Sequence, residues 1–183
     1  MNAVREPVLD AAGVREVLDR LAGEIVRFAD DRANGMVLVG IQRRGVELAE
    51  RLAERIAELQ GVEVHRGALD ITLYRDDLET VGPRPIVGET HIPVDIADRG
   101  VVIVDDVLYT GRTVRAALNE LADFGRPARI GLCVLVDRGG RELPIQADIV
   151  GLRVDAKPGD RVDVFVAERD GRDAVELVHR GSA

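Results

Sequence analysis

Residues 101–113 of this 183-residue chain read VVIVDDVLYTGRT, and they divide into three physical parts. The apolar run Val101–Val104 is typical of a strand buried in a parallel sheet. It delivers two adjacent carboxylates, Asp105 and Asp106, to the edge of that sheet. A turn with hydroxyl groups and a glycine follows at residues 110–113, and a helix then begins. The first amides of that helix and the positive end of its dipole form an anion pocket. The pattern suits a ligand with vicinal hydroxyls next to a phosphate, such as a ribose 5-phosphate.

Two further apolar runs, Met36–Ile41 and Ile130–Val136, predict buried strands. The spacing of apolar residues predicts one helix over residues 11–30, a second that ends at Gly61, and a third that Thr110 caps and Gly125 stops. The expected inner faces of the three helices are Val14, Val17, Leu18, Leu21, Ile25 and Phe28; Val46, Leu48, Leu52, Ile56 and Leu59; and Val114, Ala117, Leu118, Leu121 and Phe124.

The rest of the chain adds strands and one long polar segment. Residues 62–74 look extended. Strands are predicted at Ile149–Val154 and Val162–Ala167, and Ala174–Val178 is expected to pair with the last of them. Residues 75–98 are polar, contain three prolines and lack a helical period, and connections of that length are usually functional lids or hairpins.

Strands that alternate with helices predict an α/β fold, with a central, mostly parallel sheet flanked by helices. We expect one domain over residues 1–183. Ligands of such sheets bind at the carboxyl ends of the strands, and three polar clusters fall there: Gln42–Gly45, Asp105–Asp106 and Asp137–Gly139. The sequence therefore predicts a single site at this edge of the sheet.

Composition narrows the class of protein. The net charge of -8 excludes a uniformly basic nucleic-acid binder, although it leaves room for a local basic face. No apolar run is long enough to span a bilayer, so we expect no membrane association. Cys133 is the only cysteine, which excludes an intrachain disulfide and fits a cytoplasmic protein. His65, His91 and His179 have no spacing typical of metal ligands or of a catalytic triad.

The motif at residues 101–113 resembles the phosphoribosyl pyrophosphate (PRPP) motif of type I phosphoribosyltransferases. Together with Asp70–Asp77 and with Val136–Gly139 followed by Arg141–Ile145, it resembles the PyrR family over nearly the whole chain. Members are uracil phosphoribosyltransferases that also act, in many bacteria, as RNA-binding attenuators of pyrimidine operons. The resemblance implies a type I phosphoribosyltransferase fold with a flexible hairpin or hood, and PRPP, uracil and UMP as ligands. It also implies Mg²⁺, held mainly by PRPP.

The resemblance also assigns roles to residues. Asp105 and Asp106 would hold the ribose hydroxyls, and Arg44 and Arg75 would stabilise the departing pyrophosphate, Arg75 from the hood. The loop at Gln42–Gly45 would contact pyrophosphate, often through a non-proline cis peptide, although Arg43 stands where PyrR proteins usually have threonine. The residues expected to bind PRPP or UMP are Val104, Val107, Leu108, Tyr109, Thr110, Gly111, Arg112, Thr113, Gln42, Arg43 and Gly45. Those expected to bind the base are Val136, Asp137 and Arg138.

Two alternatives remain open. The chain could be chiefly an RNA-binding attenuator, but Gly140, Gln146 and Leu152 replace residues that are usually histidine, arginine and lysine in RNA-binding members. The candidate RNA contacts that remain are Arg138, Arg141 and Arg153. The chain could also transfer phosphoribose to another base, although hypoxanthine-guanine enzymes commonly have aspartate where this chain has Tyr109. The family suggests a homodimer or a larger homo-oligomer.

Overall fold

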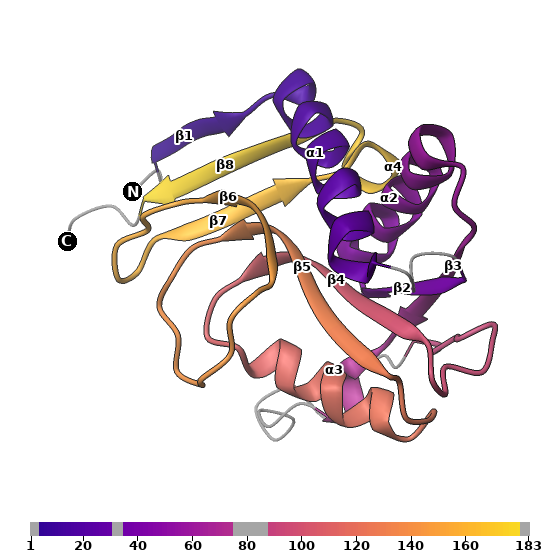
Figure 1. Ribbon diagram of the computed structural model, residues 1–183. Helices are drawn as coiled ribbons and strands as arrows, with labels where there is room; N and C mark the ends of the chain where they lie inside the picture. Colours follow the sequence, from indigo (N-terminus) through magenta and orange to yellow (C-terminus); the bar gives the residue numbers. More distant parts are fainter. Residues whose placement is uncertain (1–3, 31–34, 75–87, 180–183) are drawn as a thin grey trace.

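Five parallel strands form the centre of the fold in the computed structural model, which describes residues 4–30, 35–74 and 88–179. Their order across the sheet is β3-β2-β4-β5-β6, and each neighbouring pair runs parallel (Figure 1). The strands are β2 (Met36–Ile41), β3 (Val64–Leu69), β4 (Gly100–Leu108), β5 (Arg129–Asp137) and β6 (Ile149–Arg153). The acid pair of the 101–113 motif therefore lies on the middle strand.

Helices cover both faces of this sheet because its strands are apolar on both sides. Helices α1 (Ala11–Ala29) and α2 (Arg44–Gln60) pack on one face, and α3 (Arg112–Ala122) packs on the other (Figure 1). Alternation along β4 separates the two cores: Val102 and Val104 join the cluster with α1 and α2, whereas Val101 and Ile103 join the cluster with α3. The predicted flanked parallel sheet is confirmed.

A second sheet of three antiparallel strands, in the order β1-β8-β7, lies beside the first. It is built from β1 (Val4–Leu9), β7 (Arg161–Phe165) and β8 (Ala174–His179), and α4 (Ala167–Asp170) connects the last two. The pairing of β7 with β8 confirms the prediction for the C-terminal strands. Strand β1 was not predicted, because its sequence VREPVL has no regular apolar alternation and its first four residues are exposed.

Several local predictions were wrong. Residues 71–74 form a 3-10 helix, η2 (Ile71–Tyr74), rather than an extended segment. The residue that caps α3 is Gly111, in a left-handed conformation, and not Thr110. Leu59 is exposed because the last turn of α2, residues 57–60, is exposed on all sides.

Two apolar residues of the α3 segment are also exposed, against the prediction. Phe124 lies beyond the end of the helix at Ala122, so the helical spacing does not extend to it. Leu118 is exposed because the buried stripe of α3 is turned toward Ala116 and Glu120, both of which are buried.

The expected hood falls largely on residues 75–87, which lie outside the described residues. In the described part of the chain, no helix is both long and apolar enough to cross a membrane.

Two glycines let the start of α2 pack directly against the sheet. A Cβ on Gly40 would overlap the carbonyl oxygen of Gly45 and the Cα of Val46. A Cβ on Gly45 would lie 2.5 Å from the carbonyl oxygen of Val104. Backbone atoms cannot move aside as a flexible side chain can, so this contact fixes the start of α2 beside the end of β4.

We expect Gly40→Ala to lower the free energy of unfolding by about 1–3 kcal/mol, the usual cost of overpacking a core. Urea unfolding followed by circular dichroism measures this change. Gly23→Ala is the matched control, because a Cβ there would meet only the Arg27 side chain, at 3.5 Å, and alanine favours the helix. Equal stability of the Gly40→Ala variant and the wild type would contradict the close approach.

Candidate active site

A cavity of about 530 Å³ opens at the carboxyl ends of β2, β3 and β4. It brings together residues that are far apart in the sequence. Of the predicted site residues it is lined by Gln42, Arg43, Arg44, Asp105, Asp106, Val107 and Thr113; it is also lined by Asp70, Thr72, Gly88 and Arg169, which were not predicted. The acidic and basic clusters therefore face one space, as the topology of a parallel sheet requires.

The acid pair lines this cavity at the end of β4. Asp105 is only 6% exposed, and its Oδ1 accepts a hydrogen bond from the backbone N–H of Asp106 at 2.9 Å. Asp106 Oδ1 accepts from the N–H of Val107 at 2.8 Å. Burial, together with the neighbouring charge of Asp106, raises the pKa of Asp105 well above its ordinary value. Burial also raises the pKa of Asp106, and the Val107 amide and the Arg44 charge partly offset this.

The loop after β4 turns the chain into α3. Gly111 has a φ of 94°, a left-handed conformation that favours glycine, and Thr110 Oγ1 accepts from the N–H of Arg112 at 3.3 Å. The carbonyl of Thr110 accepts from the N–H groups of Glu142 and Leu143 at 3.0 and 3.1 Å. The segment at Glu142 and Leu143 thus holds the start of this loop, and α3 begins directly after it, at Arg112.

The basic wall of the cavity comes from the start of α2 and from α4. The Gln42–Arg43 peptide bond is cis, as the resemblance led us to expect. The Arg44 guanidinium is held by Asp170, with Nε at 3.2 Å from Oδ2 and Nη2 at 3.0 Å from Oδ1. Arg169 pairs with Glu47 of α2. Sequence reasoning missed Asp170 and Arg169, because both lie more than a hundred residues from α2 and no local motif marks them.

Asp70 closes another side of the cavity. Its carboxylate accepts from the N–H of Thr72 at 2.9 Å, from the Thr72 hydroxyl and from the N–H of Gly88. Although burial opposes it, these hydrogen bonds hold the pKa of Asp70 below its ordinary value. Asp70 therefore stays charged and ties together two distant parts of the cavity wall. Arg75, predicted to act from the hood, lies outside the described residues.

The predicted base-binding residues form a separate cluster at the end of β5. Asp137 pairs with Arg141 at 2.7 Å. Arg138 is buried, stacks on the Tyr109 ring at 3.9 Å from its centroid, and donates to the carbonyl of Asp160 at 2.8 Å. These side chains do not line the 530 Å³ cavity, although β5 neighbours β4 at the same sheet edge.

Some predicted ligand-binding residues have their side chains in the core. Val104 and Val136 pack in the cluster with α1 and α2, and Leu108 packs in the cluster with α3. Gly45 is buried against Val104, as described above. Only the backbone groups of these four residues are suited to contact a ligand.

Known proteins that are similar in sequence to this chain identify its family. The family model of the phosphoribosyl transferase domain matches residues 6–166. The bifunctional protein PyrR of Deinococcus radiodurans is 53% identical over 177 residues, which cover 97% of this chain and 96% of the relative. The bifunctional protein PyrR of Thermus thermophilus is 55% identical over 176 residues, which cover 96% of this chain and 97% of the relative.

Solved structures show the same fold at much lower identity. A hypoxanthine phosphoribosyltransferase from Staphylococcus aureus matches with a TM-score of 0.70 at 19% identity, over 98% of both chains. A hypoxanthine-guanine phosphoribosyltransferase from Bacillus anthracis matches with a TM-score of 0.72 at 18% identity, over 98% of this chain and 100% of the other. These matches confirm the predicted type I phosphoribosyltransferase fold. The chain therefore belongs to the phosphoribosyl transferase family and, within it, to the bifunctional PyrR proteins.

Proposed function

We propose that this protein is a cytoplasmic uracil phosphoribosyltransferase that converts uracil and PRPP to UMP and pyrophosphate. One observation carries the proposal: an acid pair, of which Asp105 is buried and Asp106 partly buried, faces a basic wall across a 530 Å³ cavity, beside the start of α3. Acids on one side and arginines on the other match a reaction that builds positive charge on a sugar and negative charge on a leaving group. Identity above 50% to bifunctional PyrR proteins supports the same reaction.

In this proposal the acidic residues act on the sugar and the arginines act on the leaving group. Asp105 and Asp106 would hold the ribose hydroxyls and stabilise the positive charge that builds on the ring as the bond from C1 to pyrophosphate breaks. The loop at residues 110–113, at the start of α3, would hold the 5-phosphate. Arg44 would stabilise the departing pyrophosphate, and Arg43 adds a second cation to that wall. N1 of uracil then bonds to C1 and loses its proton to the departing pyrophosphate or to solvent, and catalysis rests on positioning and electrostatics.

Mg²⁺ fits this donor set, because it is usually bound by one or two carboxylates together with substrate phosphates. Within residues 4–30, 35–74 and 88–179, no group of three or more His, Cys, Asp or Glu side chains is suited to a metal. We therefore propose that PRPP holds most of the Mg²⁺ coordination, and that Asp105 and Asp106 are the side chains that would hold it from this chain. When bound, the metal supplies positive charge beside the leaving group.

Regulation through RNA is a second candidate function, and it depends on how accessible its three candidate contact residues are. Arg138 is buried under its stack with Tyr109, and Arg141 is held by Asp137 and by three backbone carbonyls. Arg153 alone of the three is exposed. Each phosphate contact that is lost weakens RNA binding steeply, so we rank catalysis above attenuation. A homo-oligomeric assembly and a single domain over residues 1–183 stay predictions.

The proposed reaction can be tested directly. We expect the protein, incubated with PRPP and Mg²⁺, to form UMP and pyrophosphate from uracil and little product from hypoxanthine, guanine, adenine or cytosine. Chromatography of the nucleotide products measures this preference. A preference for any other base would refute the uracil assignment, and release of no pyrophosphate with any base would refute the activity.

Asp105→Asn should separate stability from activity. A folded-state pKa above the unfolded value means that the wild type loses stability as pH rises through the range between the two values. The amide does not titrate, so the variant should not lose stability over that pH range and should be more stable than the wild type at the upper end of it. Its kcat/KM for PRPP should nevertheless fall by roughly 100-fold or more, as when an electrostatic catalytic group is removed.

Thermal unfolding between pH 4 and pH 8 and steady-state kinetics check both halves of this prediction. Glu16→Gln, which alters an exposed carboxylate of α1, is the control and should change neither quantity. Turnover by Asp105→Asn at the wild-type rate would rule out the role of the acid pair.

A gel shift with pyrimidine-operon leader RNA tests the regulatory function. We expect weak binding that falls steeply between 50 and 200 mM salt and does not tighten with UMP. Nanomolar binding that requires UMP would reverse our ranking of catalysis above RNA attenuation.

A further inference from the structure

Asp170 binds Arg44, which is the one predicted catalytic arginine among the residues that the structure describes. Two hydrogen bonds join its carboxylate to the Nε and Nη2 edge of Arg44, at 3.2 and 3.0 Å. The carboxylate is itself fixed, because Oδ2 also accepts from the N–H of Val166 at 2.8 Å. The Arg44 guanidinium holds the pKa of Asp170 below its ordinary value, so the carboxylate is charged at neutral pH. Arg44 is therefore held by a group that the backbone of α4 orients.

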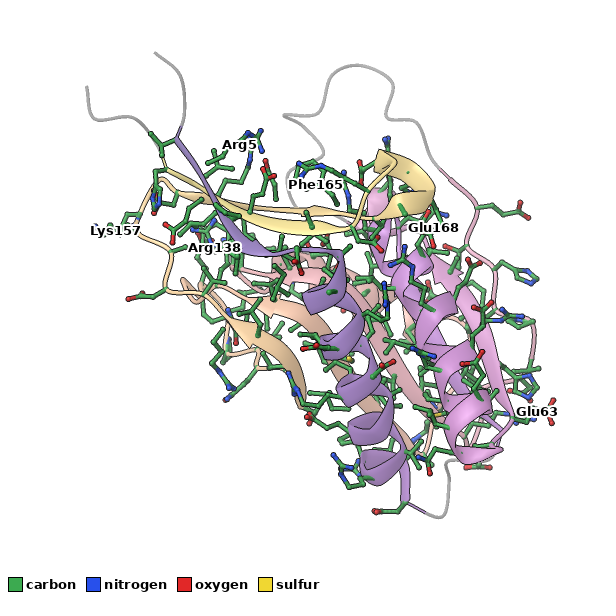
Figure 2. All side chains as sticks on the ribbon, turned by 90° about the horizontal axis from the view of Figure 1, so that it is seen from above. Arg5, Glu63, Arg138, Lys157, Phe165 and Glu168 are labelled. Carbon is green, nitrogen blue, oxygen red and sulfur yellow. The ribbon has the colours of Figure 1, made fainter. Side chains whose placement is uncertain are left out.

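Other contacts attach α4 to α2 independently of Asp170. Arg51 of α2 binds Glu168 at 2.8 and 2.6 Å and Asp173 at 2.9 Å (Figure 2, where Glu168 is labelled). Asp173 Oδ1 also accepts from the N–H of Ala167 at 2.8 Å. The Arg51 pairs lie outside the 530 Å³ cavity, whereas the Arg44 pair lies at its wall. The docking of α4 therefore does not depend on Asp170 alone, whereas Asp170 is the carboxylate that contacts Arg44.

The pair leaves Arg44 able to bind an anion. A guanidinium carries five N–H donors in one plane, and Asp170 uses two of them. A free arginine side chain has many rotamers, and ordering it on a ligand costs binding free energy. A bidentate carboxylate removes that freedom before the ligand arrives, and the plane of the guanidinium is then already set.

We propose that Asp170 is a positioning residue, which holds Arg44 in the orientation that binds the pyrophosphate group at the cavity wall. The proposal rests on the proposed function only in the role given to Arg44. Asp170 is a carboxylate beside a site for anions, so its two possible effects on anion binding have opposite signs. Removing a negative charge near the site should by itself tighten the binding of an anion. Removing a positioning group should weaken that binding.

The test compares Asp170→Asn with Asp173→Asn. Titration calorimetry with magnesium pyrophosphate is the main measurement, because it needs no turnover. We expect Asp170→Asn to raise the Kd for pyrophosphate roughly tenfold, about 1.4 kcal/mol, and Asp173→Asn to leave it within twofold. Both variants should lower the melting temperature, because both lose an arginine pair that attaches α4. Asp170→Glu, which keeps the charge on a longer side chain, should recover part of the loss.

Kinetics give a second readout. With PRPP and uracil, Asp170→Asn should raise KM for PRPP and leave KM for uracil unchanged. If the wild type forms no UMP but binds pyrophosphate, the proposed function fails and the calorimetry still tests the role of Asp170. An unchanged or lower Kd in Asp170→Asn, equal effects of the two variants on Kd, or no pyrophosphate binding by the wild type would each overturn the proposal.

Discussion

The parallel pairing of β4 with β2 on one side and β5 on the other is the constraint on which the site depends. Parallel strands in one sheet end at the same edge, so the residues that follow them meet without any local sequence signal. The loop after β2, the acids at the end of β4 and the turn after β5 are brought to one edge in this way. Gly40 and Gly45 sharpen the arrangement, because they let the start of α2 approach the backbone of β4 directly.

The acid pair shows what such a site costs. Burial and the neighbouring charge of Asp106 both disfavour ionisation of Asp105, and its pKa is raised. A fold optimised for stability alone would place apolar side chains there. Positive charge delivered by a ligand, by a metal or by a sugar in its transition state offsets the same penalty. The penalty for ionising Asp105 and the affinity of the acid pair for a developing cation therefore have one physical origin.

Much of the fold could be predicted from the sequence, because its signals are periodic and local. The strands Met36–Ile41 and the start of β4 are continuous apolar runs, and the helix over residues 11–30 has a clear 3.6-residue period. Strand β1 gave no such signal, since it lies at the edge of its sheet and is mostly exposed. The errors at Leu59 and Phe124 arose at helix ends, where the apolar pattern of the sequence continues beyond the last residues that pack against the sheet.

The site residues also differ in whether a local sequence signal marks them. The acids and the loop at residues 110–113 lie within nine residues of one another and form a recognisable motif, so the sequence alone predicts them as parts of one site. The groups that it missed, Asp70, Arg169 and Asp170, act through tertiary contacts. Of the 25 cationic residues only Lys157 is lysine, and the other 24 are arginine.

In the folded chain, several of these arginines bind carboxylates that are distant in sequence, and planar two-point pairs of this kind are what arginine makes better than lysine. Helix α4 is attached to α2 by such pairs, for no residue of α4 is buried, whereas the antiparallel sheet packs through Val164, Val175 and Leu177 into the apolar cluster with α1 and α2. An attachment made of ion pairs sets the direction of each guanidinium as well as the distance between the elements. The part of the chain with the weakest sequence signal therefore fixes the orientation of an arginine in the cavity.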